Sequence, residues 1–202
     1  MPDAFRRLVE LFSQFPGIGP RQARRFVYHL LGQPASELQE LAELLKNLKQ
    51  QVALCPSCFR YHSGKQNTLC SICSDKKRDE TKLLIVEKDA DLEQIERAGT
   101  YDGTYFVLGG KIPILDEHPE KRIRVGKLEK ALTERGTVAE IIFALSTTPE
   151  GEHTETYLRQ KFSDIIQKNS LQVSVLARGL STGAELENAD TETLRSALKN
   201  RA

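Results

Sequence analysis

Apolar residues at the start of the chain recur at helical spacing. One face of the first predicted helix carries such residues at i, i+3, i+4 and i+7: Phe5, Leu8, Val9 and Phe12. Pro16 and Gly17 then break the pattern. Pro20 suits the first position of a helix, where a missing N–H is tolerated, so the next apolar stripe predicts a second helix from Pro20 to Leu31, ended by Gly32.

A third helix is predicted from near Ser36, where Gln39 stands at the spacing of a capping box. Its apolar residues are spaced alternately three and four apart: Leu38, Leu41, Leu45, Leu48 and Val52. This narrow seam suits a partner helix. Two heptads are too few for a coiled-coil assignment, so packing within the same domain and contact with another subunit both remain open.

The pattern changes after the first 80 residues to short apolar runs with helical stretches between them. Four runs predict buried strands: Lys82–Val86, Tyr105–Leu108, Glu140–Leu145 and Gln172–Ala177. Three stretches between them predict helices: Leu92–Ala98, Val125–Arg135 and Thr154–Lys168. A last short helix is predicted from Thr191 to Leu198, capped by Asp190. Alternating strands and helices predict a parallel, doubly wound sheet.

Composition narrows the class of protein. The 202 residues include 39% hydrophobic residues, which is enough for a packed core, and the formal net charge is only +1. Any nucleic-acid binding must therefore come from local clusters of basic residues. The first residues lack the apolar core of a signal peptide, and no apolar run reaches the roughly 18 residues of a membrane span, so we expect a soluble, cytoplasmic protein.

The four cysteines form two close pairs with the spacing C-x2-C-x11-C-x2-C: Cys55, Cys58, Cys70 and Cys73. Two such knuckles bring four thiolates to a tetrahedral zinc ion, and this closed shell leaves no position for a substrate. Disulfides are disfavoured in a reducing compartment. We therefore expect one structural zinc ion per chain, with His62 facing solvent rather than replacing a thiolate. The segment Ser74–Asp79 that follows is interpreted as a charged linker.

The stretch F-P-G-I-G-P-R-Q-A-R-R, from Phe15 to Arg25, contains a glycine turn followed by arginines. A dinucleotide-binding turn would follow a buried strand and carry a third glycine, and a P-loop would continue into Gly-Lys-Ser/Thr, but neither holds here. Helix, G-I-G-P turn and helix together match a helix-hairpin-helix element. In such an element Gly17 and Gly19 let backbone N–H groups approach a nucleic-acid phosphate at the start of the second helix.

Three basic residues on the second predicted helix avoid its apolar stripe: Arg21, Arg24 and Arg25. Arg21 and Arg25 are one turn apart and Arg24 lies beside them, so all three can flank one phosphate track. Contacts of this kind give affinity without sequence readout, and they weaken with salt. The alternative is an ordinary solvated basic face around a structural turn.

Glu87 ends the first predicted strand, where open parallel sheets place functional groups. A carboxylate there can act as an acid or base, or it can hold Mg²⁺. No Asp-x-Asp pair follows the run Glu140–Leu145, which leaves metal-dependent cleavage poorly equipped. Glu150 and Glu152 can face Glu87 or can form an acidic docking surface.

Taken together and in this order, these elements resemble the RecR family of recombination mediator proteins across nearly the whole chain. Besides the hairpin and the cysteines, the motifs that carry the resemblance are C-S-D-K-K-R-D, I-V-E, Y-F-V-L-G-G, P-E-G-E-H-T and A-R-G-L-S-T-G-A-E-L. The resemblance implies an α+β multidomain chain. Its parts are a helix-hairpin-helix head at residues 1–53, a four-cysteine zinc finger at 54–76, a Toprim domain with the parallel sheet at 82–177 and a short C-terminal segment at 178–202.

The resemblance also implies a function. Members of this family bind DNA without catalysing a reaction, act with RecO and RecF, and help load recombinase at single-strand gaps during repair. They form homo-oligomers such as dimers or tetrameric rings, and an acidic Toprim surface engages RecO. Carried over by position, the basic hairpin residues fall on Arg21 and Arg25 and the zinc ligands on the four cysteines, with Glu87, Glu150 and Glu152 as candidate partner contacts.

Two other classes of protein remain open at this point. One is a Mg²⁺-dependent nuclease or strand-passage enzyme that uses Glu87, and the other is a zinc scaffold that binds only protein, with the hairpin serving as plain packing. DNA cleavage that depends on Glu87 would indicate the first. DNA retention that is independent of the hairpin arginines would indicate the second.

Overall fold

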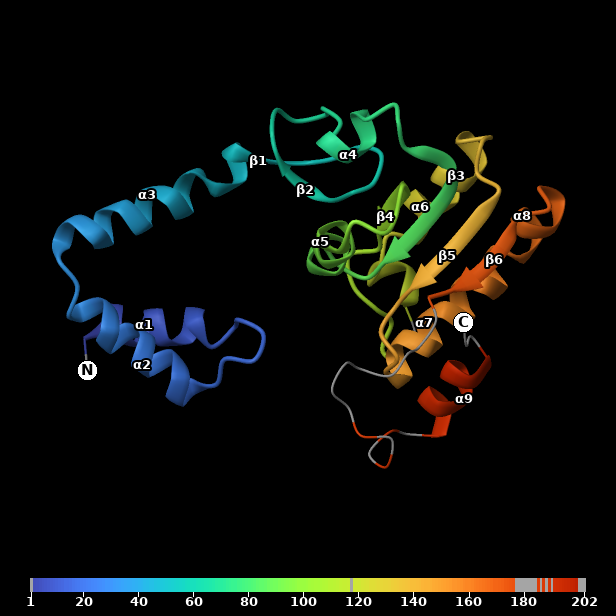
Figure 1. Ribbon diagram of the computed structural model, residues 1–202. Coiled ribbons are helices and arrows are strands. Elements are labelled where there is room, and N and C mark those ends of the chain that lie inside the picture. The colour runs from blue at the N-terminus through green and yellow to red at the C-terminus, as the bar shows by residue number, and fades with distance from the viewer. Residues whose placement is uncertain are drawn as a thin grey trace. The chain divides into compact units, whose positions relative to one another are not determined.

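The computed structural model describes residues 2–116, 118–176, 185, 187, 189 and 191–199 (Figure 1). The chain divides into two compact units, residues 1–51 and 52–202. We call residues 1–51 the helical unit, residues 52–78 the cysteine module and residues 79–176 the α/β body. The prediction of a multidomain α+β chain with a parallel sheet is confirmed.

The helical unit contains α1 (Asp3–Phe12), α2 (Pro20–Leu31) and α3 (Ala35–Gln51). The bounds of α2 match the prediction, because Pro20 opens the helix and Gly32 caps its end. α1 and α2 pack through aromatic contacts, with the rings of Phe5 and Tyr28 5.0 Å apart and those of Phe12 and Phe26 6.0 Å apart. These contacts make α1, the turn and α2 one packed hairpin of helices.

α3 departs from the prediction in two places. It begins at Ala35, and the N–H of Leu38 already bonds the carbonyl of Pro34, so Ser36 lies inside the helix and is not its cap. Val52 belongs to a strand rather than to the leucine seam. The four seam leucines are 36–62% exposed, and α3 buries no residue. Leu38 and Leu41 are thus partly covered within the helical unit, beside Leu30 of α2, whereas Leu45 and Leu48 are more than half exposed.

The cysteine module contains three short elements that the sequence pattern did not indicate: β1 (Val52–Leu54), β2 (Tyr61–Ser63) and α4 (Ser71–Ser74). β1 and β2 pair antiparallel, with Ala53 opposite His62. The module therefore holds its first two cysteines in the turn between two strands and its last two at the ends of a single helical turn.

The α/β body is built on four parallel strands in the order β4-β3-β5-β6. They are β3 (Asp79–Val86), β4 (Gly103–Val107), β5 (Glu140–Ala144) and β6 (Gln172–Val175). All four were predicted, and the parallel pairing confirms the predicted class of sheet. β3 is flanked by strands that come later in the chain on both sides, so its carboxyl end lies at the point where the strand order reverses.

Five helices and a 3₁₀ turn complete the part of the chain that is described: α5 (Asp89–Ala98), η1 (Pro119–Lys121), α6 (Val125–Glu134), α7 (Pro149–Lys161), α8 (Ser163–Lys168) and α9 (Thr191–Lys199). The single helix predicted over Thr154–Lys168 is wrong. α7 begins at Pro149, where Thr148 caps it, and the chain breaks at Phe162, which is 2% exposed and anchors the break in the core. The predicted cap Asp190 lies outside the described residues.

Alternate residues of β3 point to opposite faces of the sheet, so each face carries its own apolar core. Leu83 and Ile85 lie in a core covered by α6, α7 and α8. Leu84 and Val86 lie in a second core, which is covered by α5 and by the cysteine module (Figure 1). Burial on both faces explains why the strands have continuous apolar runs rather than alternating ones.

Candidate DNA-binding and metal-binding sites

The turn between α1 and α2 leaves its two glycines in open space. Gly17 has φ +77°, a left-handed conformation that favours glycine, and the N–H of Ile18 closes the turn on the carbonyl of Phe15 at 3.0 Å. Gly19 has an extended backbone, with φ −86° and ψ 169°, and serves as the N-cap of α2. A Cβ at either glycine would meet no protein atom within 4 Å. A ligand can therefore approach this backbone closely.

The first turn of α2 exposes backbone donors. The first helical hydrogen bond runs from the N–H of Ala23 to the carbonyl of Gly19 at 2.9 Å. Pro20 has no N–H, and no acceptor in the described part of the chain is assigned to the N–H groups of Arg21 or Gln22. Such groups at a helix start carry the positive end of the helix dipole and favour an anion.

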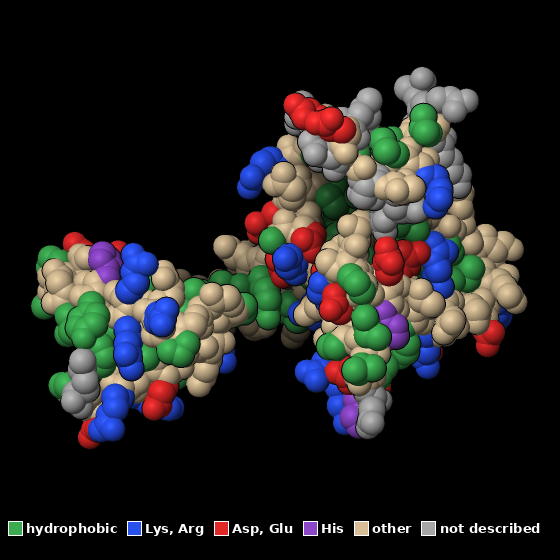
Figure 2. All heavy atoms as spheres, turned by 90° about the horizontal axis from the view of Figure 1, so that it is seen from below, with side chains coloured by type: hydrophobic (Ala, Val, Ile, Leu, Met, Phe, Trp, Pro, Cys, Tyr) green, Lys and Arg blue, Asp and Glu red, His purple; other side chains and the backbone are tan. Residues whose placement is uncertain are grey.

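The three arginines of α2 are exposed and have no hydrogen bond or ion pair with any described residue: Arg21, Arg24 and Arg25. The arginines of α1 behave differently, because Arg6 bonds Asp3 at 2.5 Å and Arg7 bonds Glu10 at 3.0 Å. Figure 2 shows several Lys or Arg side chains gathered on one face of the helical unit. Within the described residues, three free cations thus lie beside unpaired N–H donors.

The four cysteine sulfurs lie within 4.8 Å of one another, as the spacing predicted. Cys58 Sγ and Cys70 Sγ are 3.6 Å apart, close to the separation of about 3.8 Å between two sulfurs that bind one zinc ion tetrahedrally at about 2.3 Å. The N–H of Cys70 points to Cys55 Sγ at 3.5 Å and helps to hold that sulfur as a thiolate. The donor set fits a four-sulfur metal site.

The four sulfurs are close enough to perturb one another. Hydrogen bonds from Cys58, Cys70 and Cys73 lower the pKa of Cys55, whereas hydrogen bonding to Cys55 raises the pKa of Cys58 and Cys73. His62 is half-buried, with Nε2 3.1 Å from the carbonyl oxygen of Thr68, and the ligand cluster does not include it. His62 therefore shares its hydrogen bonds with the module rather than facing solvent alone.

The cysteine module is fixed to the α/β body by contacts that sequence reasoning missed. The N–H of Val107, at the end of β4, donates to the carbonyl of Cys58 at 2.8 Å. Arg124 Nη1 donates to the carbonyls of Val107 at 2.8 Å and Phe59 at 3.3 Å. Arg135 Nη2 donates to the carbonyl and the hydroxyl of Ser57 at 2.6 and 2.7 Å. Two arginines that follow β4 in the sequence thus hold the first cysteine knuckle.

Arg78 is part of the fold, so the interpretation of Ser74–Asp79 as only a linker is wrong. Its guanidinium bonds Glu96 at 2.5 and 2.8 Å, and Tyr105 donates to the same carboxylate at 2.6 Å. Burial alone would raise the pKa of Glu96, but the hydrogen bonds from Arg78 and Tyr105 lower it overall. The pKa of Tyr105 is raised, chiefly by burial.

Glu87 lies at the carboxyl end of β3 but is only 7% exposed. Its Oε1 accepts a hydrogen bond from the N–H of Ser146 at 2.7 Å, which ties the ends of β3 and β5 together. Ser146 Oγ lies 3.0 Å from Thr148 Oγ1, which also accepts from Lys111 Nζ at 2.9 Å. The groups around this strand end therefore include hydroxyls, the Lys111 ammonium and the Asp91 carboxylate, whose charge interacts with that of Glu87. The burial of Glu87 leaves it little surface for contact with a partner.

Glu150 and Glu152 lie in the first turn of α7, and Lys111 Nζ is 3.8 Å from the carboxylate of Glu150. Gly151 stands between them because a Cβ there would overlap the carbonyl oxygen of Ser146. Glu150 is partly exposed and Glu152 is exposed, so both reach the surface. Among the residues that the structure describes, the four cysteines form the one cluster of three or more metal-binding side chains.

The helices of the described ranges do not meet the requirements of a membrane span. None of them combines the length and the apolar character that crossing a membrane requires.

A paired-helix hairpin with free arginines, a four-cysteine cluster that fits a metal ion and a parallel α/β domain are features of a multidomain chain that match, in order, the proteins of DNA recombination and repair to which it is similar. Family models agree: "RecR, helix-hairpin-helix" matches residues 5–49, "Toprim domain" matches 81–177 and "RecR, C-terminal" matches 179–202. The chain belongs to the RecR family.

Relatives named "Recombination protein RecR" match the chain over almost its whole length. The protein of Legionella pneumophila is 38% identical over 200 residues, which cover 99% of this chain and 96% of that protein. The protein of Cutibacterium acnes is 37% identical over 196 residues, covering 97% and 94%. The protein of Lactobacillus acidophilus is 32% identical over 200 residues, covering 99% and 97%.

Proposed function

We propose that this chain is a DNA-binding protein of recombinational repair that acts without catalysing a reaction, in the cytoplasm, where chromosomal DNA lies. The observation that carries the proposal is the start of α2, where three arginines without a partner among the described residues flank backbone donors that have no assigned acceptor. Arg21, Arg24 and Arg25 bind phosphates, while Gly17 and Gly19 keep the approach to the backbone open.

The proposed contacts are all with the phosphate backbone, so binding is independent of base sequence. The three cations lie along one short face of one helix, which gives a single subunit a weak grip. Several subunits acting together supply the affinity through a raised effective concentration. We propose a homo-oligomer, a dimer or a tetrameric ring, and the exposed leucine seam of α3 supports it.

One zinc ion per chain completes the cysteine module in this proposal. Cys55, Cys58, Cys70 and Cys73 would hold it, and its chemistry there is structural, because four thiolates fill a tetrahedral shell. The ion would fix the knuckles that Arg124 and Arg135 bind. It would therefore stabilise the side of the α/β body on which the module packs.

The absence of catalysis rests on the donor set at the end of β3. Glu87 is buried against Ser146, and the Asp91 carboxylate, whose charge interacts with that of Glu87, already accepts a hydrogen bond from the N–H of Lys88. Among the described residues, no three metal-binding side chains gather at this strand end. A magnesium ion for phosphoryl chemistry takes oxygen ligands that usually include one or two carboxylates from the protein. This edge of the sheet therefore offers few ligands for the Mg²⁺ ion of a nuclease.

We propose RecO and RecF as protein partners, with loading of recombinase at single-strand gaps as the shared task. The exposed carboxylates of Glu150 and Glu152 are the candidate contacts for RecO. Glu87 helps to position Glu150 and Glu152, because its hydrogen bond from the N–H of Ser146 fixes the loop that leads into α7. Its burial favours this indirect role over a direct contact.

The decisive experiment measures DNA binding by Arg21→Ala/Arg25→Ala over a salt series on duplex DNA. Each phosphate contact that the variant no longer makes should flatten the slope of log K against log salt by about 0.9 per engaged subunit. The matched control is Arg6→Ala/Arg7→Ala, which removes the same charge from arginines that are already paired on α1. The proposal fails if the two double variants change the slope equally, or if the first leaves it unchanged.

A second measurement tests the absence of catalysis. The wild-type protein is incubated with supercoiled and gapped DNA in the presence of Mg²⁺ or Mn²⁺, and we expect neither nicking nor hydrolysis. Cleavage that disappears in Glu87→Gln would replace the proposal with the metal-dependent enzyme.

A further inference from the structure

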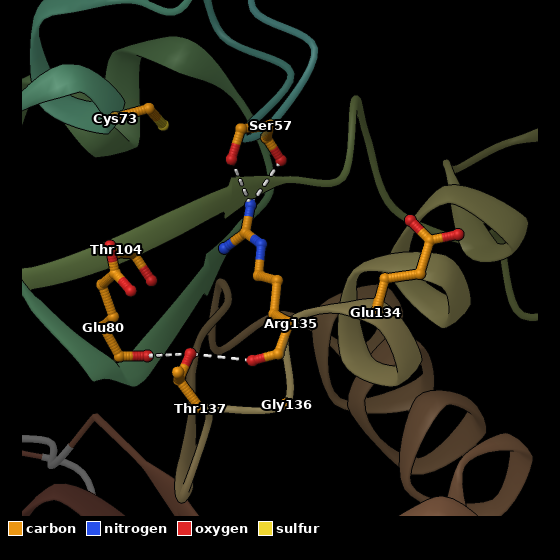
Figure 3. Close-up of a pocket in the computed structure, with 8 residues that line it drawn as sticks. All are labelled: Ser57, Cys73, Glu80, Thr104, Glu134, Arg135, Gly136 and Thr137. Carbon is orange, nitrogen blue, oxygen red and sulfur yellow. Dashed lines mark hydrogen bonds between the residues drawn. The ribbon is translucent and has the colours of Figure 1, made fainter.

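A cavity of about 470 Å³ lies between the cysteine module and the α/β body (Figure 3). Its lining comes from both: Ser57, Cys73, Glu80, Thr104, Glu134, Arg135, Gly136 and Thr137. Figure 3 shows the Arg135 side chain reaching to Ser57, with the two hydrogen bonds drawn. A cavity of this volume admits small molecules far larger than water.

Cys73 differs from the other three cysteines in its burial. Cys55 and Cys58 are 0% exposed and Cys70 is 1% exposed, whereas Cys73 is partly exposed. Cys73 is also the one cysteine that lines the cavity. Cys73 is thus the ligand residue that borders the cavity and is partly exposed, whereas the other three cysteines are buried in the module.

The charges of the lining favour some reagents over others. Glu80 and Glu134 contribute two carboxylates, and the guanidinium of Arg135 is already engaged by Ser57. An anion that enters meets this acidic surplus, whereas a small neutral molecule does not. Neutral electrophiles and hydroperoxides are the chemical class that fits the cavity.

We propose that Cys73 is a modification site, whose sulfur reacts with a neutral electrophile or a hydroperoxide and would thereby release a metal ion held by the four cysteines. This inference rests on the proposed zinc site. A thiolate is the nucleophilic form of cysteine, and reaction follows exposure. Among the four ligand residues, Cys73 is the one that is partly exposed and that lines the cavity.

The oxidative step balances with hydrogen peroxide as the oxidant. The Cys73 thiolate attacks one peroxide oxygen, the O–O bond breaks, and a sulfenic acid and hydroxide form. A second thiolate of the cluster, whose sulfur lies within 4.8 Å, then attacks the sulfenic sulfur, forms a disulfide and expels a second hydroxide. Two thiolates lose two electrons to one peroxide, so the cluster would keep only two of the four thiolates that would hold a zinc ion.

The test labels the full-length, zinc-loaded protein with one equivalent of N-ethylmaleimide and quantifies each modified cysteine by peptide mass spectrometry. A zinc indicator dye follows metal release in the same sample. We expect Cys73 to carry about five times more label than any other ligand, with zinc release in step with it. Hydrogen peroxide should likewise release zinc and give a disulfide that includes Cys73.

Two glycine variants make the test specific without touching a ligand. Gly136 lines the cavity, Gly126 does not, and a Cβ at either meets no atom within 4 Å. Gly136→Phe should slow the labelling of Cys73 about threefold by occupying part of the cavity, and Gly126→Phe should leave it unchanged. Label spread evenly over the cysteines, or equal rates in the two variants, overturns the inference. Protein that purifies without one zinc per chain instead overturns the zinc site on which it rests.

Discussion

Arg124 connects the cysteine module to the α/β body, and replacing it with alanine measures how much this connection contributes to the free energy of unfolding. Its guanidinium bonds the carbonyls of Val107 and Phe59 at 2.8 and 3.3 Å. A hydrogen bond from a charged donor contributes about 1.5 kcal/mol and the longer of the two contributes less, so Arg124→Ala should lower the free energy of unfolding by about 2–3 kcal/mol. For a chain of this length the expected fall in Tm is about 5–10 °C.

Far-UV circular dichroism in urea is the suitable assay, because the chain contains no tryptophan. Hydrogen exchange at the amide of Val107, which donates to the carbonyl of Cys58, reports the same joint locally. Arg97→Ala is the matched control, since Arg97 is an exposed arginine of α5 without a partner among the described residues. The reasoning is refuted if both variants unfold at the same urea concentration and Val107 exchanges no faster in Arg124→Ala.

Three further outcomes are expected. Gly19→Ala should weaken DNA binding about tenfold, because the added Cβ would stand in the path of a phosphate. It should lower the free energy of unfolding by less than about 1 kcal/mol, because the Cβ meets no protein atom within 4 Å. Unchanged affinity for DNA would contradict this prediction. A zinc chelator should speed hydrogen exchange in residues 52–176 more than in the helical unit, since the buried thiols share a core with β3 and β4; a uniform change would count against it. The pKa of Glu96 is lower in the folded protein than the unfolded value of about 4.3, so its carboxylate stabilises the fold above that pH, and this stabilisation is lost as the pH falls through the folded pKa. Glu96→Gln should therefore weaken the dependence of the free energy of unfolding on pH in the acid range. An unchanged dependence would exclude this linkage.

Local patterns were enough to predict most of the fold. Pro20 and Gly32 mark both ends of α2, and four apolar runs mark strands that are buried on both faces. The errors arose where a tertiary contact decided the outcome. Phe162 breaks one predicted helix because the core holds its side chain, and Val52 leaves the leucine seam to pair with Ser63. Neither contact has a periodicity that a sequence window can detect.

The candidate sites follow the same division. Spacing predicted that the cysteines converge, and helical period predicted that Arg21, Arg24 and Arg25 avoid the packed face. The partners of Arg124 and Arg135 include backbone carbonyls and a serine more than 60 residues away in the sequence, and nothing in the sequence marks them. The burial of Glu87 was equally hidden, because it depends on how the loop after β5 folds over the end of β3.

The contact between Val107 and Cys58 also bears on how the protein survives when metal is scarce. β4 is an edge strand, and the carbonyl of Cys58 occupies a donor at its carboxyl end that would otherwise be free to pair. A module without its ion would release this donor and offer the strand to another copy of the chain. Zinc limitation would then lower the solubility of the protein before it lowered DNA binding. The arginines of α2 would remain unchanged in the aggregated protein.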